Sequence, residues 1–405
     1  MNRFEKVKSK LNTIWEAIVR FIKKYDLIIF AIIFFAIALV IRLSFLDFES
    51  DDYKYFLSHW YQEVVNQGGF ASFKTQIGDY TPAYRYIIIF LTLFNKNPLH
   101  MYKAVSIIFD FMLAGFVGLL IKHITKNNLL TLLAYATILF LPNVFFNSAI
   151  WAQCDVIFTT FIIISLYFIL KDKSHLAMAF YAVSLSFKLQ AIFFLPVIVV
   201  LIFKKKINLF SIITFMLTYM LIPIPAVIAG ANYFDALIGI YINQAGEYSQ
   251  LVLNAPNIYA IFKNTPQELS KMFTWMSLGF VGIICVVLYK YELKYDDRTI
   301  ILIAYIFSLI IPFILPHMHE RYFYLSDILG ILFIFTNIKK IYIPIITILS
   351  SFLVVEKILF GWNGTFITLE LDGIIMLSGI VLLLIHSIKY LKENHESYLK
   401  EIEVN

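Results

Sequence analysis

The sequence predicts an all-α protein, a polytopic bundle of transmembrane helices with about 12 membrane crossings. Of its 405 residues, 60% are hydrophobic and only 15% are charged, and the mean hydropathy is +0.79. A soluble globular chain has about 45–50% apolar and 25% charged residues. The apolar runs are long and continuous. In lipid, only helices and closed barrels satisfy the backbone, and continuous runs favour helices.

The first segment, residues 1–25, is basic and predicts an amphipathic helix at the cytoplasmic membrane surface. Its apolar residues recur at spacings of three and four, so they share one helical face, while lysines occupy the rest. The apolar positions are Phe4, Val7, Leu11, Ile14, Ile18 and Phe21. The alternative, a solvated basic tail, does not account for this apolar stripe.

Residues 26–390 then form the expected transmembrane domain, followed by a cytoplasmic tail at 391–405. The first span runs from Leu27 to about Leu46, which is too long for the core of a signal peptide. The later spans are expected at 102–121, 129–147, 156–170, 176–187, 190–203, 208–229, 271–290, 299–315, 322–337, 341–360 and 371–388. The segments 176–187 and 190–203 are too short for two full spans, which favours a broken or re-entrant hairpin.

Basic clusters set the expected orientation. With the N-terminus in the cytoplasm, every even-numbered span ends on lysines or arginines, as the positive-inside rule requires. These clusters are Lys122/Lys126, Lys171/Lys173, Lys204–Lys206, Lys290/Lys294/Arg298, Lys339/Lys340 and Lys389/Lys392. Both termini are then cytoplasmic, and the two longest loops, 47–101 and 230–270, face the outside. We expect an integral protein of a bacterial plasma membrane.

Composition and missing motifs exclude several functions. The net charge of +6 is spread over short clusters, so no nucleic-acid partner is expected. Cys154 and Cys285 lie in or beside apolar runs, which does not indicate a disulfide framework. The sequence contains neither G-x-G-x-x-G nor G-x-x-x-x-G-K-[ST], so nucleotide binding has no support.

The first outer loop carries adjacent carboxylates, Asp51 and Asp52, directly after the first span. A carboxylate at the membrane boundary is a candidate general base. The same loop contains Asp79 and Tyr80 among many aromatic residues, which suit an interface or the face of a sugar. For any single carboxylate, the alternative is an ordinary solvated acidic loop.

Two further polar groups follow at the same outer face. Trp151, Gln153 and Asp155 lie in a short loop between two spans, and Lys188 and Gln190 lie at the tip of the expected hairpin. A lysine left within the bilayer costs about 2.5–3.5 kcal/mol. Snorkelling to the surface is one explanation for Lys188, and binding of an anion is the other.

The last polar group is the segment 316–322, with sequence Pro-His-Met-His-Glu-Arg-Tyr. Arg321 offers a planar guanidinium for a phosphate, with His319 and Glu320 beside it. We expect no cofactor. The alternative is a divalent metal bound by His317 and His319 with one of the acidic pair, but the number and spacing of ligands are incomplete.

Carboxylates, a lysine and an arginine are thus expected together at one outer face of a helical bundle without a nucleotide site. A reaction there requires an activated substrate delivered within the membrane. A polyprenyl-phosphate sugar fits, because its tail lies in lipid, its phosphate at the interface and its sugar in water.

These segments resemble the GT-C glycosyltransferase superfamily, especially bacterial relatives of the dolichyl- or polyprenyl-phosphate-sugar-dependent gluco- and mannosyltransferases. The resemblance spans roughly residues 26–340, and each motif alone is weak. The motifs occur in the family's order as Ser50-Asp51-Asp52-Tyr53 with Trp60-Tyr61, Asp79-Tyr80-Thr81-Pro82, Trp151 to Asp155, Ser186 to Gln190, and His319-Glu320-Arg321. Asp51 and Asp52 both match forms of the catalytic position, and Thr81 departs from the glucosyltransferase-type D-Y-P-P.

The resemblance implies transfer of a hexose, with inversion, from a polyprenyl-phosphate donor to an extracytoplasmic glycan or glycolipid acceptor. Asp52, or alternatively Asp51, would act as the general base. Lys188, Arg321 and His319 would bind the donor phosphate. The substrate-binding residues would be Asp79, Tyr80, Trp151, Gln153, Asp155, Gln190 and Glu320, with Asn254, Asn257 and Tyr259 as weaker acceptor contacts.

Two other classes remain as alternatives. A transporter or flippase of lipid-linked glycans would also be polytopic, but such proteins usually carry internal repeats and polar residues near the midplane. No repeat is visible, and Asp110 is the main polar residue within a span. A scaffold protein would leave the order of the motifs unexplained.

Overall fold

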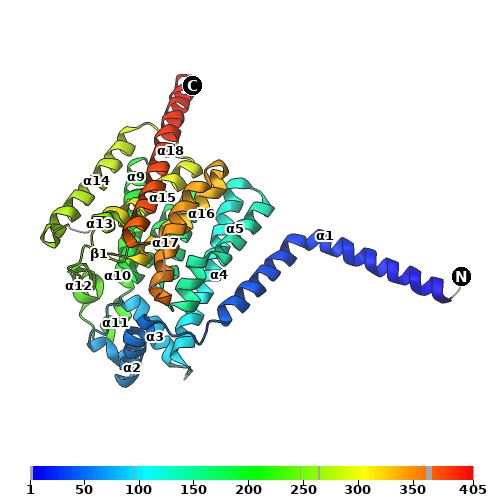
Figure 1. The fold of residues 1–405 in the computed structure, drawn as a ribbon, viewed down its shortest axis with the longest axis horizontal. Helices are drawn as coiled ribbons and strands as arrows, with labels where there is room; N and C mark the ends of the chain where they lie inside the picture. The colour runs from blue at the N-terminus through cyan, green and yellow to red at the C-terminus, as the bar shows by residue number, and fades with distance from the viewer. Residues whose placement is uncertain (1–2, 95, 247, 263–264, 362–366, 405) are drawn as a thin grey trace.

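The computed structural model describes residues 3–94, 96–246, 248–262, 265–361 and 367–404. In this part of the chain nearly all regular structure is helical, which confirms the predicted all-α class. Helices gather into one bundle, from which the N-terminal helix α1 (Arg3–Leu43) projects (Figure 1). Its backbone is kinked at Tyr25, where the expected interface helix gives way to the expected span.

The remaining helices follow in chain order. The first half comprises α2 (Ser58–Asn66), α3 (Pro82–Thr92), α4 (Pro98–Thr125), α5 (Asn128–Phe140), α6 (Pro142–Phe145), α7 (Asp155–Leu170), α8 (Ser174–Phe187) and α9 (Leu195–Phe203). The second half comprises α10 (Ser211–Leu221), α11 (Ile224–Ile228), α12 (Ile240–Gly246), α13 (Ile258–Ile261), α14 (Ser270–Lys290), α15 (Asp297–Ile314), α16 (Tyr324–Thr336), α17 (Tyr342–Phe360) and α18 (Leu369–Val404). The expected tail at 391–405 is thus helical as far as Val404.

Seven helices in the described residues are long and apolar enough to cross a membrane, or up to eight if the pair bent by 49° at Leu141 is one span. They are Lys24–Leu43, Pro98–Thr125, Ser211–Ile228, Gln267–Lys290, Asp297–Ile314, Tyr342–Phe360 and Leu369–Glu401. Long apolar helices indicate an integral membrane protein. Four other expected spans form apolar helical segments too short to pass this test, namely 155–170, 174–187, 189–203 and 324–336.

Burial separates a central helix from peripheral ones. In α15, 83% of the span is buried inside the protein, whereas α14 and the span of α1 are each 11% buried. The peripheral helices expose many large apolar side chains, as expected where lipid covers the surface. The helix α15 packs against α9, α16 and α18, so the bundle is organised around it.

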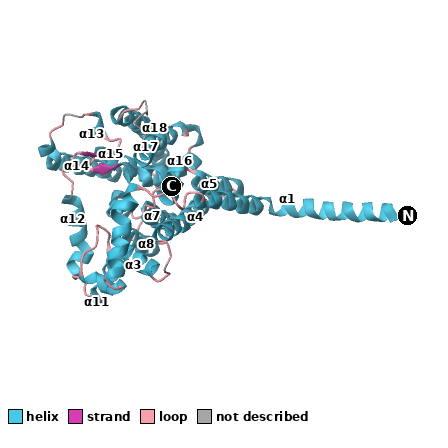
Figure 2. Cartoon of the chain, turned by 60° about the horizontal axis from the view of Figure 1, so that its bottom comes forward, coloured by secondary structure: helices cyan, strands magenta, loops and turns pink. Residues whose placement is uncertain are grey.

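A short parallel ladder joins two distant loops. The strand β1 (Val252–Leu253) pairs with β2 (Met318–His319), with Val252 opposite Met318 and Leu253 opposite His319. Figure 2 shows the ladder beside α13 and α15. The long loop after α11 is thereby attached to the segment that follows α15.

A buried ion pair attaches α1 to the bundle. The guanidinium Nε of Arg42 lies 2.7 Å from Oδ2 of Asp110 on α4, and both side chains are fully buried. Arg42 also donates to the carbonyl oxygens of Ala38 and Leu139, and the Ser148 hydroxyl donates to Asp110. The ion pair therefore joins α1, α4, α5 and the π-helix Phe146–Ile150.

We predict that Arg42→Met lowers the free energy of unfolding by about 3–5 kcal/mol, because it leaves Asp110 buried without its cation. Unfolding of the detergent-solubilised protein, followed by circular dichroism, measures the loss. The double variant Arg42→Met/Asp110→Leu should recover most of it, since neither charge is then buried. An equal loss in the double variant would show that the pair's charges are not the source of the effect.

Candidate functional site

The first outer loop is anchored to the loop before α7. The Ser50 hydroxyl donates to the carbonyl oxygen of Trp151 at 3.0 Å and accepts from the backbone N–H of Tyr53. This places the turn containing Asp51 and Asp52 at the N-terminal end of α7. A π-helix, Tyr53–Leu57, begins directly after the acidic pair.

The two adjacent carboxylates lie in different surroundings. Oδ2 of Asp52 accepts a hydrogen bond from Nε2 of Gln153 at 2.5 Å and lies 3.5 Å from Nη1 of Arg321. The Asp51 side chain is 82% exposed and lies 3.8 Å from Nζ of Lys54. Oδ1 of Asp52 accepts no hydrogen bond from the described residues. Asp52 therefore belongs to the polar cluster, and Asp51 faces away from it.

The loop Trp151–Asp155 is held by its own backbone and by α4. The Gln153 N–H donates to the carbonyl of Asn147, and the Ser106 hydroxyl donates to the carbonyl of Gln153. Ala152 has a φ of 63°, a left-handed conformation that is unfavourable for a residue with a side chain. The fully packed surroundings impose this turn, which directs Gln153 toward Asp52.

Lys188 is paired inside the protein. Its Nζ lies 2.5 Å from Oδ1 of Asp155, and Nδ2 of Asn147 donates to Oδ2 of the same carboxylate. The Asp155 side chain is 1% exposed and that of Lys188 is 13% exposed. Burial alone would raise the pKa of Asp155, but Lys188 and Arg321 hold it below its ordinary value.

Arg321 lies between three acidic groups and an aromatic ring. Its Cζ is 5.3 Å from the ring centroid of Trp151, and its Nε is 3.6 Å from Glu320 but makes no hydrogen bond with a described residue. Burial alone would lower the pKa of Arg321, but Asp52 and Asp155 raise it above its ordinary value. Arg321 is therefore a buried cation with a donor still available.

The segment before Arg321 is fixed by the β1–β2 ladder. His317 has a φ of 62°, and its Nδ1 donates to the carbonyl of Gln250 at 2.7 Å. The His319 ring packs edge-on against Tyr248 and Tyr322, and its Nδ1 lies 3.9 Å from Glu320. His317 therefore has a structural role in the ladder, whereas His319 lies beside Glu320 and Arg321.

Tyr80 of the segment 79–82 packs between two other aromatic rings. Trp60 and Tyr80 meet edge to face at 5.1 Å, and Tyr80 packs on Tyr84 at 4.3 Å. Gly78 has a φ of 57°, and a Cβ there would lie 2.3 Å from the Trp60 ring, so only glycine fits. Burial raises the pKa of Tyr80, whose hydroxyl contacts Cys154. The Asp79 side chain is exposed, and its carbonyl oxygen accepts from Gln244.

The structure brings together most of the expected site residues but not all. The cluster contains Asp52, Trp151, Gln153, Asp155, Lys188, Glu320 and Arg321, with Tyr80 and His319 at its edge. Gln190 is buried two residues after Lys188, and its Oε1 accepts no hydrogen bond from a described residue. Asp51 and the Asp79 carboxylate lie outside it. Asn257 caps α13 through its side chain, and the Tyr259 hydroxyl donates to the carbonyl of Ile314, so both are engaged in holding the second loop.

The sequence analysis gave no role to three residues that support the site. Ser50, Ser106 and Asn147 position the two loops through the contacts above. The only signal for Asn147 is an amide at the end of an otherwise apolar run. Ser50 adjoins the acidic pair, and nothing in the sequence distinguishes Ser106 from other small polar residues of a span.

The cluster contains three carboxylates, Asp52, Asp155 and Glu320, against two cations, Lys188 and Arg321. Among the residues that the structure describes, no group of three or more His, Cys, Asp or Glu side chains could hold a metal ion. The chemistry available is a carboxylate oxygen free to accept a proton beside an arginine with a free donor.

Comparison with known proteins gave no match to any protein-family model and none to the curated proteins.

We predict that Lys188→Met destabilises the protein by about 3 kcal/mol at pH 7, because it leaves the Asp155 carboxylate buried without its main cation. Thermal unfolding in detergent measures this. The deficit should shrink as the pH falls below about 4: wild-type protein then loses the stability that the depressed pKa of Asp155 provides. The variant has no such contribution to lose.

The matched control is Lys188→Met/Asp155→Asn, which removes both charges and should recover stability. A deficit in Lys188→Met that stays constant between pH 7 and about pH 2 would contradict the assignment of the effect to Asp155.

Proposed function

We propose that this protein is an integral membrane glycosyltransferase that moves a hexose from a polyprenyl-phosphate donor to an extracytoplasmic glycan or glycolipid. One observation carries the proposal: Asp52 and Arg321, from segments about 270 residues apart, lie 3.5 Å from each other with Oδ1 and Nε free of hydrogen bonds to described residues. A base and an anion-binding group are the two parts that this transfer needs.

The surroundings of the cluster favour a lipid-linked donor. Asp155 is the first residue of α7, and Arg321 follows α15, so the cluster lies where apolar helices end. A polyprenyl chain would lie along the apolar helices while its phosphate reaches Arg321 at the interface. The order of the segments, which resembles the GT-C superfamily, supports the same donor class.

In the proposed reaction, Asp52 removes the proton from the acceptor hydroxyl as that oxygen attacks the anomeric carbon of the sugar. The bond between this carbon and the phosphate oxygen breaks, and polyprenyl phosphate leaves with the bonding electrons. Arg321 stabilises the charge that grows on the leaving phosphate. Attack opposite to the leaving group inverts the configuration at the anomeric carbon.

The other residues have supporting roles in this scheme. Gln153 orients the Asp52 carboxylate, and Trp151 holds the guanidinium plane of Arg321. Lys188 keeps Asp155 charged and in place, and reaches the phosphate only by sharing its ammonium with that carboxylate. Trp60 and Tyr80 offer aromatic faces to the sugar.

We place this site on the extracytoplasmic face of a bacterial plasma membrane, with both termini inside and about 12 crossings once the shorter apolar helices are counted. Positive-inside counting supports this orientation. Abundant isoleucine, lysine, asparagine, phenylalanine and tyrosine suggest an AT-rich genome, hence undecaprenyl phosphate as carrier.

A transporter of lipid-linked glycans is the competing proposal. Its main support in the sequence was a carboxylate within a span, Asp110. That carboxylate is paired with Arg42 and Ser148, which gives it a structural role. We therefore favour the transferase.

The proposal is tested by incubating the purified full-length protein with radiolabelled polyprenyl-phosphate hexoses and a membrane glycolipid extract. Label should move from the donor to the acceptor fraction, and free polyprenyl phosphate should accumulate in equal amount. Transfer from a nucleotide sugar in a lipid-free assay would overturn the donor class. Vectorial movement of intact donor across vesicles, without label transfer, would favour the transporter.

We further predict that Asp52→Asn lowers turnover by about 10²–10⁴-fold, because it removes the general base while preserving volume. The matched control is Asp51→Asn, a neighbouring carboxylate that faces away from Arg321 and should lose less than about tenfold. Initial rates at saturating donor measure both. A collapse only in Asp51→Asn would reassign the base, and full activity in both variants would remove the acidic pair from the mechanism.

A further inference from the structure

A second charged region lies at the opposite end of the bundle from Asp52. The helix α7 begins at Asp155 in the polar cluster, and after 16 residues, about 24 Å, its last residues Ile169 and Leu170 line a cavity. The helix α15 runs the other way, from Asp297 at this cavity toward the cluster. The two regions are therefore separated by the length of the central helices.

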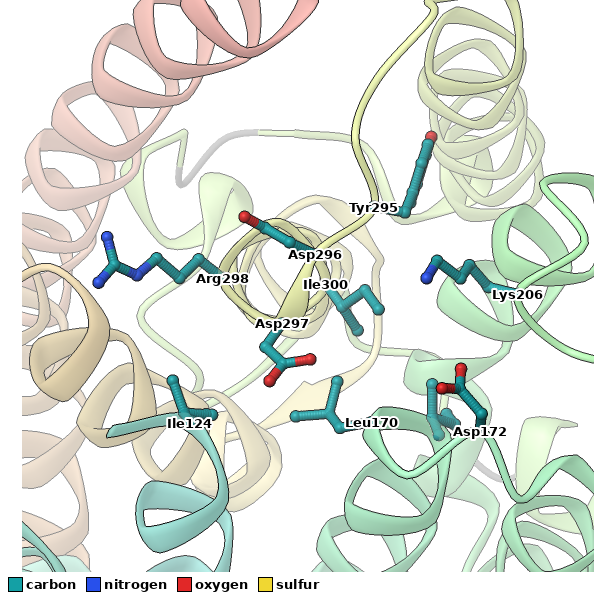
Figure 3. Close-up of a pocket in the computed structure, with 10 residues that line it drawn as sticks. Ile124, Leu170, Asp172, Lys206, Tyr295, Asp296, Asp297, Arg298 and Ile300 are labelled. Atoms are coloured by element: carbon teal, nitrogen blue, oxygen red, sulfur yellow. The ribbon is translucent and has the colours of Figure 1, made fainter. Parts of the chain in front are cut away.

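Two adjoining cavities occupy this end. Figure 3 shows the smaller, about 330 Å³, in which Lys206 lies on the side of Tyr295 and Asp172 while Arg298 points away. Its three acidic residues outnumber its two basic ones, so this smaller cavity does not suit an anion. The larger, about 890 Å³, shares Lys206, Tyr295 and Asp296 with it. This larger cavity is lined by five lysines, Lys204, Lys205, Lys206, Lys290 and Lys294, against Glu292 and Asp296.

Three of these lysines are available to a ligand. Lys204 donates to the carbonyl of Tyr291, and Lys294 pairs with Glu401 at 2.9 Å. Lys205 and Lys290 form no ion pair with any residue that the structure describes. Lys206 interacts electrostatically with Asp297, at a distance longer than an ion pair. All three are exposed. The larger cavity thus has an uncompensated positive charge that suits an anion.

The end of α18 closes one side of the larger cavity. The Asn394 amide exchanges two hydrogen bonds with the backbone of Lys294, and Nδ1 of His395 donates to the carbonyl of Glu292. These contacts hold the loop between α14 and α15, and Tyr398 on the next turn lines the cavity. The cavity is therefore a built feature, fixed by side-chain contacts to three backbone groups.

Two exposed aromatic residues line the larger cavity, next to an apolar helix face. Phe203 and Tyr289 line it, are 62% and 47% exposed, and meet at 5.6 Å. On α14, Ile283, Val286 and Val287 precede Lys290 by seven, four and three residues, so they share its face, and all are exposed. An apolar stripe thus leads from the hydrophobic surface of the bundle to a lysine of the cavity.

We propose that the larger cavity binds the phosphate headgroup of an anionic phospholipid, with its acyl chains along the exposed stripe of α14. Lys205, Lys206 and Lys290 contact the phosphate. Basic pockets between membrane helices on the positive-inside face are suited to such headgroups. Free inorganic phosphate carries the same charge, but it has no apolar part that could contact Phe203, Tyr289 or the apolar stripe of α14. These apolar contacts therefore favour a phospholipid.

The test measures thermal unfolding of the full-length protein in neutral detergent with added dioctanoyl phosphatidylglycerol, dioctanoyl phosphatidylcholine or inorganic phosphate. Phosphatidylglycerol should raise the unfolding midpoint in a saturable manner, because it binds the folded state. Half-saturation should shift by at least about tenfold in K205N/K206Q/K290Q. Asparagine is chosen at position 205, since the backbone there has a φ of 57°.

The matched control, K339Q/K340Q/K389Q, removes three lysines outside the cavity and should respond like wild type. An equal response to phosphatidylcholine, or an equal loss in the control variant, would overturn the site. Equal stabilisation by inorganic phosphate at the same concentration would overturn the lipid and leave a free-anion site.

Discussion

The ion pair between Arg42 and Asp110 is the contact on which both halves of the candidate site depend. It lies eight residues before Ser50 on one side, and through Ser148 it reaches the loop that begins at Trp151. A charge buried in an apolar bundle is tolerated only with its partner, so α1 has one favourable register against α4. Because that register is fixed, Ser50 meets the Trp151 carbonyl, and Asp52 is carried to Gln153. Asp52, the proposed general base, is thereby positioned by charges in the interior of the bundle.

The charges of the cluster divide into a closed pair and an open pair. Lys188 and Asp155 form a nearly fully buried ion pair at 2.5 Å. Arg321 is shared between Asp52 and Glu320 at 3.5 and 3.6 Å, and its Nε donates to no described residue. Because the cluster has three carboxylates and two cations, it repels an incoming phosphate. The phosphate could bind only if Arg321 exchanged its contact with Asp52 for one with the phosphate. That exchange would free Oδ2 of Asp52 from its cation at the moment when the carboxylate must accept a proton. In the proposed reaction, donor binding and activation of the base would then be coupled through Arg321.

Much of this architecture could be predicted from the sequence, because lipid leaves the backbone few choices. Continuous apolar runs predicted the helices. Polar residues between these runs identified the site candidates Asp52, Gln153, Lys188 and Arg321. The sequence could not show that Lys188 is paired with Asp155, since 33 positions separate them and the pairing depends on how α7 and α8 pack. The adjacent carboxylates also could not be distinguished, because their orientation depends on the Ser50 contact and the π-helix after it. The crossing count stays a prediction where helices such as α16, with 13 residues, are shorter than a membrane is thick.

The two ends of the bundle differ in how their charges are compensated, and this difference has a physical origin. At the Asp52 end, acids and bases alternate within a few ångströms and are mostly buried, so each charge depends on another for its solvation. At the opposite end, Lys205 and Lys290 are exposed and form no ion pair with a described residue, so water or lipid phosphate is left to solvate them. The first arrangement suits the proposed transfer reaction, because small shifts of charge in a low-dielectric cluster alter reactivity. The second suits the proposed contact with lipid phosphate. The helices α7 and α15 connect them, and forces that orient the lysine end therefore also set the depth of Asp155 and Arg321.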